Sequence, residues 1–196
     1  MINVYLFDLD DTLIDSRIYA KLYQPVLQVV KDKTGLTGEK LDKQARLLGL
    51  AKNKYGRWDT GDLCRELGLL EEYYKELNKL IAIVPVLHDA VEKVFRKLKN
   101  KGGRIGIVSN SQSRTINTYV LKYNLGDYVD FIFSPDDAGC RKDDDNYWKI
   151  LIKKEKLNPE TCLIIGDNEQ EDIKIPQKFG FKTVHLKTPT DLGTVQ

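Results

Sequence analysis

Five short apolar runs, rich in β-branched and aromatic residues, constrain the fold of this chain more than any other feature of its sequence. They predict buried strands at residues 3–7, 104–108, 130–133, 162–165 and 182–186. Helical patterns separate the later runs, so that strand and helix alternate from Pro85 to the end of the chain. Parallel strands need such long crossovers to return to the same edge of a sheet. The predicted class is therefore α/β, with a Rossmann-like parallel sheet that carries helices on both faces.

The segment from residue 16 to residue 84 breaks this alternation, because it has helical stripes and no convincing strand. The clearest stripes are Leu41, Ala45 and Leu48, and then Leu67, Leu70, Tyr74, Leu77 and Leu80. These patterns predict an all-helical domain at residues 16–84. It would be inserted into a Rossmann-like core formed by residues 1–15 and 85–196.

Within the insertion, turn-forming residues indicate where helices end. The turn TGLTGEK at residues 34–40 is one expected break, and Thr37 is a candidate helix cap there. The segment KYGRWDTGD at residues 54–62 is the other. Pro25 lies inside the first stripe and is expected to kink a helix or to start one.

Charge and cysteine usage narrow the functional classes. The 31 basic and 29 acidic residues are mixed along the chain, so the net charge of +2 creates no basic field and nucleic acid is not an expected partner. Cys64, Cys140 and Cys162 form no CxxC pair, which favours reduced thiols in a cytoplasm over a disulfide framework or a zinc site. No stretch approaches the ~20 apolar residues of a membrane span, and no basic leader precedes the first strand, so neither membrane insertion nor secretion is expected.

The first strand ends abruptly in acids, in the sequence VYLFDLDDTLIDS. Asp8, Asp10 and Asp11 follow the apolar run, and Thr12 comes next. Carboxylates after a strand often only cap a turn. Three of them at the carboxyl end of a parallel strand, however, repel one another unless a cation or a proton lies among them, and ligands bind at that end of open α/β sheets. A metal site explains the cluster most simply.

A second strand ends in the same way, in the sequence LIIGDNEQEDI. Its acids are Asp167, Glu169, Glu171 and Asp172. Hard oxygen donors with no His or Cys nearby favour magnesium, which binds one or two carboxylates together with waters and phosphate oxygens. The two acidic strand ends would meet if the strands are neighbours in the sheet.

Two further segments place polar groups beside predicted strand and helix ends. The sequence RIGIVSNSQS ends a strand in Ser109, Asn110 and Ser111, which can hold an anion near the start of the next helix. Lys142, in GCRKDDDN, precedes a helix that Asp144 or Asp145 would cap. Each segment taken alone is weak, since such residues cap helices in many proteins and most lysines are at the surface.

Taken together and in this order, the four segments resemble the four motifs of haloacid dehalogenase-like hydrolases, over essentially the whole chain. The resemblance implies that Asp8 is the nucleophile and that Asp10 is the general acid and base. Thr12 would help to hold the loop at the phosphate, and Ser109 and Asn110 would bind the phosphoryl group. True dehalogenases of the family lack the second aspartate, so Asp10 favours a phosphatase.

The resemblance also implies a magnesium cofactor. The ion would be held by Asp8, Asp167 and the main-chain carbonyl of Asp10, while Asp172 would act through Lys142 or through a water that the metal holds. Lys142 would also bind the substrate phosphate. A cation and a lysine are needed because the negative charge of a phosphoryl group repels a carboxylate nucleophile.

Two positions depart from the family pattern. The lysine motif often continues with proline, but here three acids at residues 143–145 follow Lys142, and Arg141 is the alternative cation. Pro176 occupies an early helical position after the fourth motif, where relatives usually have a small residue. If Asp172 caps that helix, the proline falls near the first turn, where it costs little.

The helical insertion resembles the cap domain of family members that act on small substrates, so a small phosphorylated metabolite is the expected substrate. Aromatic residues at helical spacing are more often core than substrate contacts, which weakens the case for the four candidates in the insertion. These candidates are Tyr19, Tyr23, Arg57 and Trp58. His88 and His185 are expected to be structural. The sequence leaves open whether the protein is a monomer or a homodimer.

Three other functions fit parts of the pattern. A phosphomutase of the same superfamily would pass the phosphoryl group to a sugar. A phospho-switch module, like a response-regulator receiver domain, also pairs acids with a serine or threonine and a lysine, but its phosphorylated aspartate usually follows a later strand and no long insertion follows the first. A catalytically silent interaction scaffold is disfavoured, because every catalytic residue type is present.

Overall fold

The computed structural model describes residues 1–53 and 56–195, and these form two compact units. One unit, called the core unit here, comprises Met1–Asp15 and Leu87–Gln196. The other, the helical unit, is Ser16–Val86. The start of the predicted break at residues 54–62 lies outside the described residues.

The core unit is built on a five-stranded parallel sheet in the order β3-β2-β1-β4-β5. The strands are β1 (Val4–Phe7), β2 (Arg104–Val108), β3 (Phe131–Phe133), β4 (Cys162–Gly166) and β5 (Lys182–His185). They fall on the five apolar runs, and no strand end differs from the predicted one by more than one residue. This arrangement confirms the predicted α/β class and the parallel sheet.

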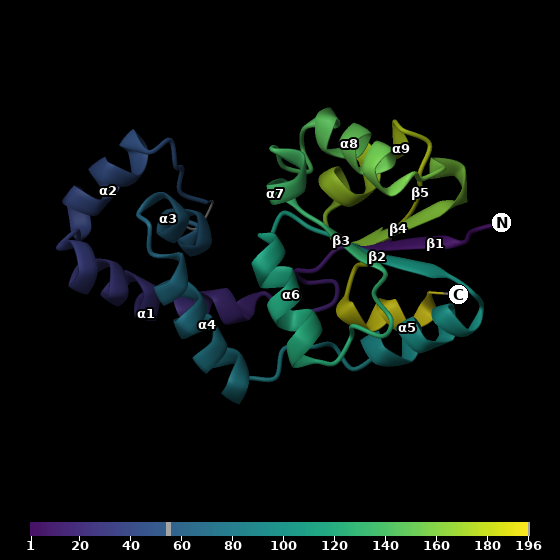
Figure 1. Ribbon diagram of the computed structural model, residues 1–196, viewed down its shortest axis with the longest axis horizontal. Helices are drawn as coiled ribbons and strands as arrows, with labels where there is room; N and C mark the ends of the chain where they lie inside the picture. Colours follow the sequence, from purple (N-terminus) through teal and green to yellow (C-terminus); the bar gives the residue numbers. More distant parts are fainter. Residues whose placement is uncertain (54–55, 196) are drawn as a thin grey trace. The chain divides into compact units, whose positions relative to one another are not determined.

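Helices cover both faces of this sheet, as Figure 1 shows. Those of the core unit are α5 (Val91–Asn100), α6 (Ser113–Lys122), α7 (Pro135–Ala138), α8 (Asp145–Glu155) and α9 (Ile175–Gln177). Shorter turns complete the unit, namely η1 (Pro159–Thr161), the π-helix η2 (Glu169–Lys174) and η3 (Pro189–Thr194). Because helices cover both faces of the sheet, the central strands β1 and β4 carry no charged residue, whereas β5 (KTVH) is more polar and has no fully buried residue.

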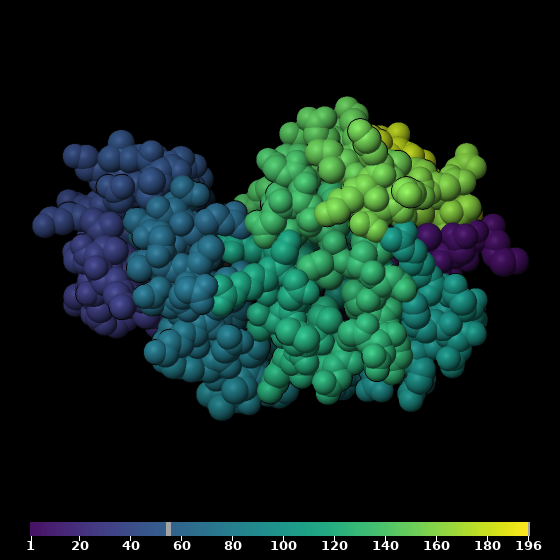
Figure 2. Space-filling model, viewed as in Figure 1, coloured from purple at the N-terminus to yellow at the C-terminus, as the bar shows by residue number. Residues whose placement is uncertain are grey.

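Strand β1 is the centre of this core. Its Leu6 side chain packs with Trp148 of α8 in one apolar cluster, while the Phe7 ring packs at a tilt against Phe95 of α5, with ring centroids 4.9 Å apart. All four residues of β1 are buried. In the space-filling view the beginning of the chain, in purple, lies at the edge of the core unit (Figure 2).

The helical unit consists of α1 (Arg17–Thr34), α2 (Gly38–Leu47), α3 (Thr60–Glu66) and α4 (Leu70–Ile83). Helix α4 packs against α1 and α3. Thr37 is at the N-cap position of α2, although its side chain makes no capping hydrogen bond. Pro25 lies inside α1 and does not start a helix, because α1 begins eight residues earlier at Arg17. Among the described helices none is long and apolar enough to cross a bilayer.

The second predicted stripe of the insertion was right at Tyr74 and Leu77, which are buried in α4, and wrong at its ends. Residues 67–80 are not one helix, because α3 ends at Glu66 and Gly68, in the left-handed conformation (φ 71°), separates it from α4. The residues of α4 that are buried are Tyr73, Tyr74, Leu77 and Ile81. Leu70 and Leu80 are only half-buried, since the packing face of α4 is rotated from the predicted one.

The aromatic candidates of the insertion are tied to one another within the helical unit. Trp58 is buried, and its Nε1 donates to Asp42 at 3.0 Å. The Tyr23 hydroxyl accepts a hydrogen bond from the main-chain nitrogen of Trp58 at 3.4 Å. The Arg57 guanidinium lies over the Tyr23 ring, 5.5 Å from its centroid. These contacts give the aromatic side chains a structural role within the unit.

Candidate active site

The acids of the first motif lie where β1 ends in the middle of the sheet. Asp8 is buried, and its main-chain nitrogen donates to the Ile165 carbonyl at 2.9 Å, which extends the β1–β4 ladder by one residue. Asp11 takes a left-handed conformation (φ 56°), so that the chain turns and the Asp11 nitrogen reaches the Ile14 carbonyl at 2.8 Å. This turn gives the two acids different surroundings, since Asp8 is buried and Asp11 is exposed to solvent.

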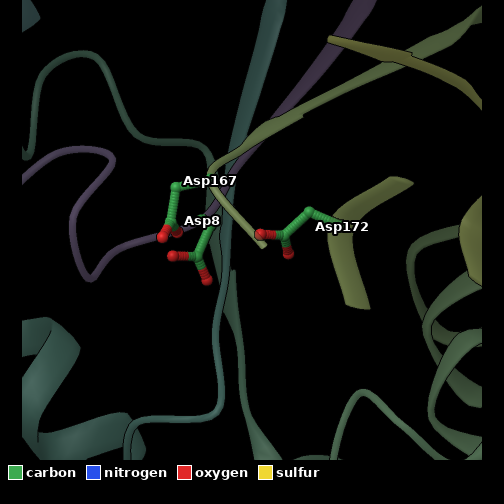
Figure 3. A group of neighbouring side chains, drawn as sticks. All are labelled: Asp8, Asp167 and Asp172. Carbon is green, nitrogen blue, oxygen red and sulfur yellow. The ribbon is translucent and has the colours of Figure 1, made fainter. Parts of the chain in front are cut away.

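Three carboxylates converge at the carboxyl ends of the two central strands (Figure 3). Asp8 follows β1, Asp167 follows β4, and Asp172 projects from η2, and each offers an oxygen within 4.8 Å of the others. Gly166 permits this approach, since a Cβ atom on it would lie 2.2 Å from the Asp172 carboxylate oxygen. The strand order β1–β4 therefore joins the two acidic sequences, as expected if the strands are neighbours.

Lys142 supplies a buried positive charge beside these acids. Its Nζ donates to Asp8 Oδ1 and, at 2.7 Å, to Asp172 Oδ1. Its side chain is only 3% exposed. Arg141, the alternative cation, is exposed, and the acids at 143–145 are exposed as well. Asp144 caps α8 by accepting from the Asn146 nitrogen at 2.8 Å, as one of the two predicted alternatives had it.

Burial and charge act in opposite directions on these groups. Burial alone would lower the pKa of Lys142, but the carboxylates of Asp172 and Asp8 outweigh it and raise the pKa, so the ammonium stays charged. Burial raises the pKa of Asp8, and the nearby Asp172 and Asp10 carboxylates add to this against the pull of Lys142. Burial, with Asp172 and Asp11, raises the pKa of Asp167 to about 6. The acids therefore need more positive charge than one lysine provides.

The second motif contributes a tightly bonded loop after β2. The Ser109 hydroxyl accepts from the Ser111 nitrogen at 3.0 Å, and the Ser109 carbonyl accepts from the Tyr147 hydroxyl at 3.0 Å. Ser109 is buried. Asn110 is half-buried and is hydrogen-bonded to Lys142 and Glu171. The third motif residue, Lys142, is thus linked directly to the second motif loop.

Thr12 and Asp10 lie on the turn after β1. The Thr12 side chain is fully buried, and its hydroxyl has no hydrogen-bond partner among the described residues. The Asp10 carboxylate oxygen Oδ2 accepts from the Ser111 hydroxyl at 2.9 Å. The Asp10 carboxylate is not one of the three that converge. The contact expected between the metal and the main-chain carbonyl of Asp10 stays a prediction.

The donor set fits magnesium. Three converging carboxylates provide hard oxygen ligands, and no His or Cys belongs to the group found among the described residues. Packed side by side, such acids carry a repulsion that a divalent cation removes. The observed group contains Asp8, Asp167 and Asp172, all of which were expected at the metal.

The turn after β4 differs from the expected one. Asp172 does not cap the following helix; instead Asn168 caps η2, accepting from the nitrogens of Gln170 and Glu171 at 3.0 and 3.1 Å. Asp172 Oδ2 accepts from the Asn168 nitrogen at 3.0 Å. The π-helical turn turns Asp172 towards the sheet, and π-turns of this kind are common at functional sites. Pro176 falls at the start of α9, where it costs little.

Sequence reasoning named Ser111 and Glu171 but missed that they, together with Tyr147, orient the motif side chains. Ser111 bonds Asp10, Tyr147 bonds the Ser109 carbonyl, and Glu171 bonds Asn110. His185, expected to be structural, has its Nε2 2.8 Å from the Asp167 carbonyl, and the carbonyl can only accept, so Nε2 carries the hydrogen. Only their positions could have indicated this role, since Ser111 lies in the second motif and Glu171 in the fourth.

Comparison with known proteins agrees with this geometry. Residues 2–180 match the model of the haloacid dehalogenase-like hydrolase family. The chain is 24% identical to a glyceraldehyde 3-phosphate phosphatase of Pyrococcus abyssi, over 95% of this chain and 82% of the relative. It is 29% identical to a phosphoglycolate phosphatase of Aquifex aeolicus, over 92% of this chain and 83% of the relative.

Solved structures share the fold. A haloacid dehalogenase-like hydrolase of Bacteroides fragilis superposes with a TM-score of 0.61 at 26% identity, covering 94% of this chain and 87% of the other. A phosphatase of Thermococcus onnurineus gives a TM-score of 0.69 at 21% identity, with 95% and 86% covered. Since the family match spans nearly the whole chain, this protein belongs to the haloacid dehalogenase-like hydrolases.

Proposed function

We propose that the protein is a magnesium-dependent phosphatase that hydrolyses a small phosphorylated metabolite through a phosphoryl group carried by Asp8. The observation that carries this proposal is the buried lysine between two acids, with Lys142 donating to both Asp8 and Asp172. A cation in this place can offset phosphate charge next to a carboxylate nucleophile. Curated relatives named as phosphatases of glyceraldehyde 3-phosphate and phosphoglycolate support the substrate class.

In the first step, an Asp8 carboxylate oxygen attacks phosphorus, the bond to the alcohol oxygen breaks, and Asp10 gives its proton to the leaving alcohol. In the second step, Asp10 takes a proton from water, the water oxygen attacks phosphorus, and the bond to Asp8 breaks to release inorganic phosphate. The Ser111 hydroxyl bonded to Asp10 Oδ2 holds this carboxylate in one orientation throughout.

The remaining residues would bind the phosphoryl group and neutralise its negative charge. Lys142 contacts the nucleophile, and Ser109 and Thr12 offer hydroxyls on the loops that end β2 and β1, where the phosphoryl oxygens would lie. Asp8, Asp167 and Asp172, with the Asp10 carbonyl, would hold the magnesium ion, which supplies positive charge to the phosphoryl oxygens. We also assign the helical insertion, predicted at residues 16–84, the role of a cap that contributes substrate selection.

The experiment is phosphate release from small phosphorylated metabolites, with and without magnesium. The panel includes phosphoglycolate, glyceraldehyde 3-phosphate, sugar phosphates, nucleotides and glycerol phosphates. We expect magnesium-dependent release that Asp8→Asn lowers by about 10⁴-fold or more, because the nucleophile is lost.

Asp11→Asn is the matched control. It removes one exposed acid from the same loop, and asparagine tolerates the left-handed conformation that Asp11 adopts (φ 56°). We expect it to retain activity within about fivefold, because Asp11 is exposed and is not one of the three converging carboxylates. Full activity in Asp8→Asn would exclude the mechanism. Release that requires an added acceptor sugar would point instead to a phosphomutase.

A further inference from the structure

The side chain of Asn110 joins three separate loops of the core unit. Asn110 follows Ser109 at the end of β2, its Oδ1 accepts from the main-chain nitrogen of Lys142 at 2.9 Å, and its Nδ2 donates to Glu171 Oε2 at 2.9 Å. The orientation of the carboxamide follows from its partners, since an N–H needs an acceptor and a carboxylate needs a donor. Both ends of the carboxamide are therefore bonded within the protein.

Glu171 is itself held in place. Its Oε2 accepts a second hydrogen bond, from Asn168 Nδ2 at 3.2 Å, and its main-chain nitrogen donates to the capping oxygen of Asn168 at 3.1 Å. Glu171 is half-buried, whereas Glu169 of the same turn is exposed and pairs with Lys174 at 3.0 Å. Glu171 is therefore a fixed acceptor for Asn110.

The main chain of Lys142 is clamped on both sides. Asn110 accepts from its nitrogen, and the buried Trp148 donates from Nε1 to its carbonyl at 2.9 Å. The side chain that starts from this clamped residue must place one ammonium group against two different carboxylates. Small displacements matter here, because a misplacement of ~1 Å in a catalytic group can cost about 10²-fold in rate.

We propose that Asn110 is a positioning residue, and that the Asn110–Glu171 pair holds the main chain of Lys142 so that its ammonium spans Asp8 and Asp172. The proposal rests on the proposed function, because it takes Lys142 to act on the phosphoryl group. It gives Asn110 a role different from the phosphate contact expected from sequence. A phosphate-binding Asn110 would act on the substrate independently of Glu171, whereas a positioning Asn110 shares its effect with Glu171.

A double-mutant cycle separates these two roles. Asn110→Ala and Glu171→Ala are each expected to lower kcat by about 10-fold to 100-fold, with KM changed less than about threefold. The double variant is expected to lose no more than the more damaged single variant, since both changes break the same link. Glu171→Gln keeps an acceptor oxygen for Asn110 and is expected to recover most of the rate.

Glu169→Ala is the matched control, because it removes an exposed acid from the same turn. It is expected to leave kcat within about twofold. Losses that multiply in the double variant, together with a raised KM in Asn110→Ala, would overturn the proposal in favour of direct substrate contact.

A second measurement does not depend on activity. Hydrogen exchange of the Lys142 amide, followed by NMR on the full chain, is expected to accelerate at least about tenfold in Asn110→Ala, because the amide loses its acceptor. Unchanged exchange would overturn the proposal whatever the kinetics. If the natural protein releases no phosphate from any compound, the proposed function fails, and the exchange rate still decides whether Asn110 holds Lys142.

Discussion

The core unit and the helical unit bury different kinds of side chain. In the core unit, Asp8, Asp172 and Lys142 are buried against one another. In the described part of the helical unit, Thr60 is the single buried polar side chain, and ion pairs such as Lys79 with Glu76 are solvent-exposed. The helical unit can therefore gain its stability from apolar packing, while the core unit holds charges whose burial is costly.

This difference indicates where function is concentrated. Buried charges are expensive unless each is paired, so a cluster that keeps three acids and one lysine at the end of a sheet is poorly explained by stability alone. The helical unit, whose interior is apolar, shows no such cluster among its described residues. Substitutions in each unit test whether buried charge matters in the core unit and apolar packing in the helical unit.

The largest effect is expected for Lys142→Met in the core unit. Removing the lysine leaves Asp8 and Asp172 buried without their cation, which should lower the free energy of unfolding by about 3–5 kcal/mol in the absence of magnesium. Phosphate release should fall by about 10³-fold or more. Urea unfolding and phosphate assays on the same preparation measure both effects.

Repeating the unfolding measurement with magnesium gives a second comparison between Lys142→Met and the natural protein. Because the ion adds positive charge among the same carboxylates, it should stabilise Lys142→Met more than it stabilises the natural protein. A variant as stable as the natural protein without magnesium would show that the buried pair contributes little, and the contrast between the two units would then be lost.

The next effect is expected for Leu77→Ala in the helical unit. Leu77 is fully buried in α4, which packs on α1 and α3, and its truncation should cost about 3 kcal/mol. Hydrogen exchange should accelerate in α1, α3 and α4 and remain unchanged in β1 and β4, if the two compact units open separately. Equal loss of protection in the strands would show that they unfold as one.

The sequence was informative about those features that depend on short-range patterns. The apolar runs identified all five strands, because central strands such as β1 are buried on both faces. The acids after β1 and β4 were expected to meet if those strands were neighbours. The stripe predicted for α4 was only partly right, although Tyr74 and Leu77 are buried as expected. Apolar residues on a surface helix occupy more than one face, so spacing alone did not separate buried Tyr73 and Ile81 from half-buried Leu70 and Leu80.

The links between loops were not predictable in the same way. Asn110 and Glu171 are 61 residues apart, and nothing local to either indicates the other. The π-helical η2 is also hidden, because it departs from the 3.6-residue period on which helical patterns rest. It was this turn that made Asn168 the cap and left Asp172 to bond Lys142.

A moderate effect of pH on the free energy of unfolding is expected from one buried thiol in each unit. Burial raises the pKa of Cys64, in the helical unit, to about 12, and that of Cys162, in the core unit, to about 11. An unfolded thiol ionises above about pH 8.5, so the unfolded chain loses a proton that the folded chain keeps, and stability falls as pH rises. Between pH 7 and pH 9.5 each thiol should account for about 1.4 kcal/mol of that fall.

Alanine variants isolate this contribution. Cys64→Ala and Cys162→Ala should each flatten the pH dependence of unfolding relative to the natural protein, while Cys140→Ala, at a half-buried position, should do so less. An unchanged slope in Cys64→Ala would mean that the thiol ionises within the folded helical unit, and that the apolar packing of this unit admits water.

The smallest effect is expected for Lys79→Met, which removes the lysine of an exposed pair in the helical unit. Lys79 Nζ lies 2.6 Å from Glu76 Oε1, yet the lysine side chain is 60% exposed. Water screens such a pair, so the free energy of unfolding should change by less than ~0.5 kcal/mol. Urea unfolding beside Lys142→Met gives the comparison directly, since both replace a lysine by methionine. A loss at Lys79 as large as that at Lys142 would contradict the view that the two units differ in how they use charge.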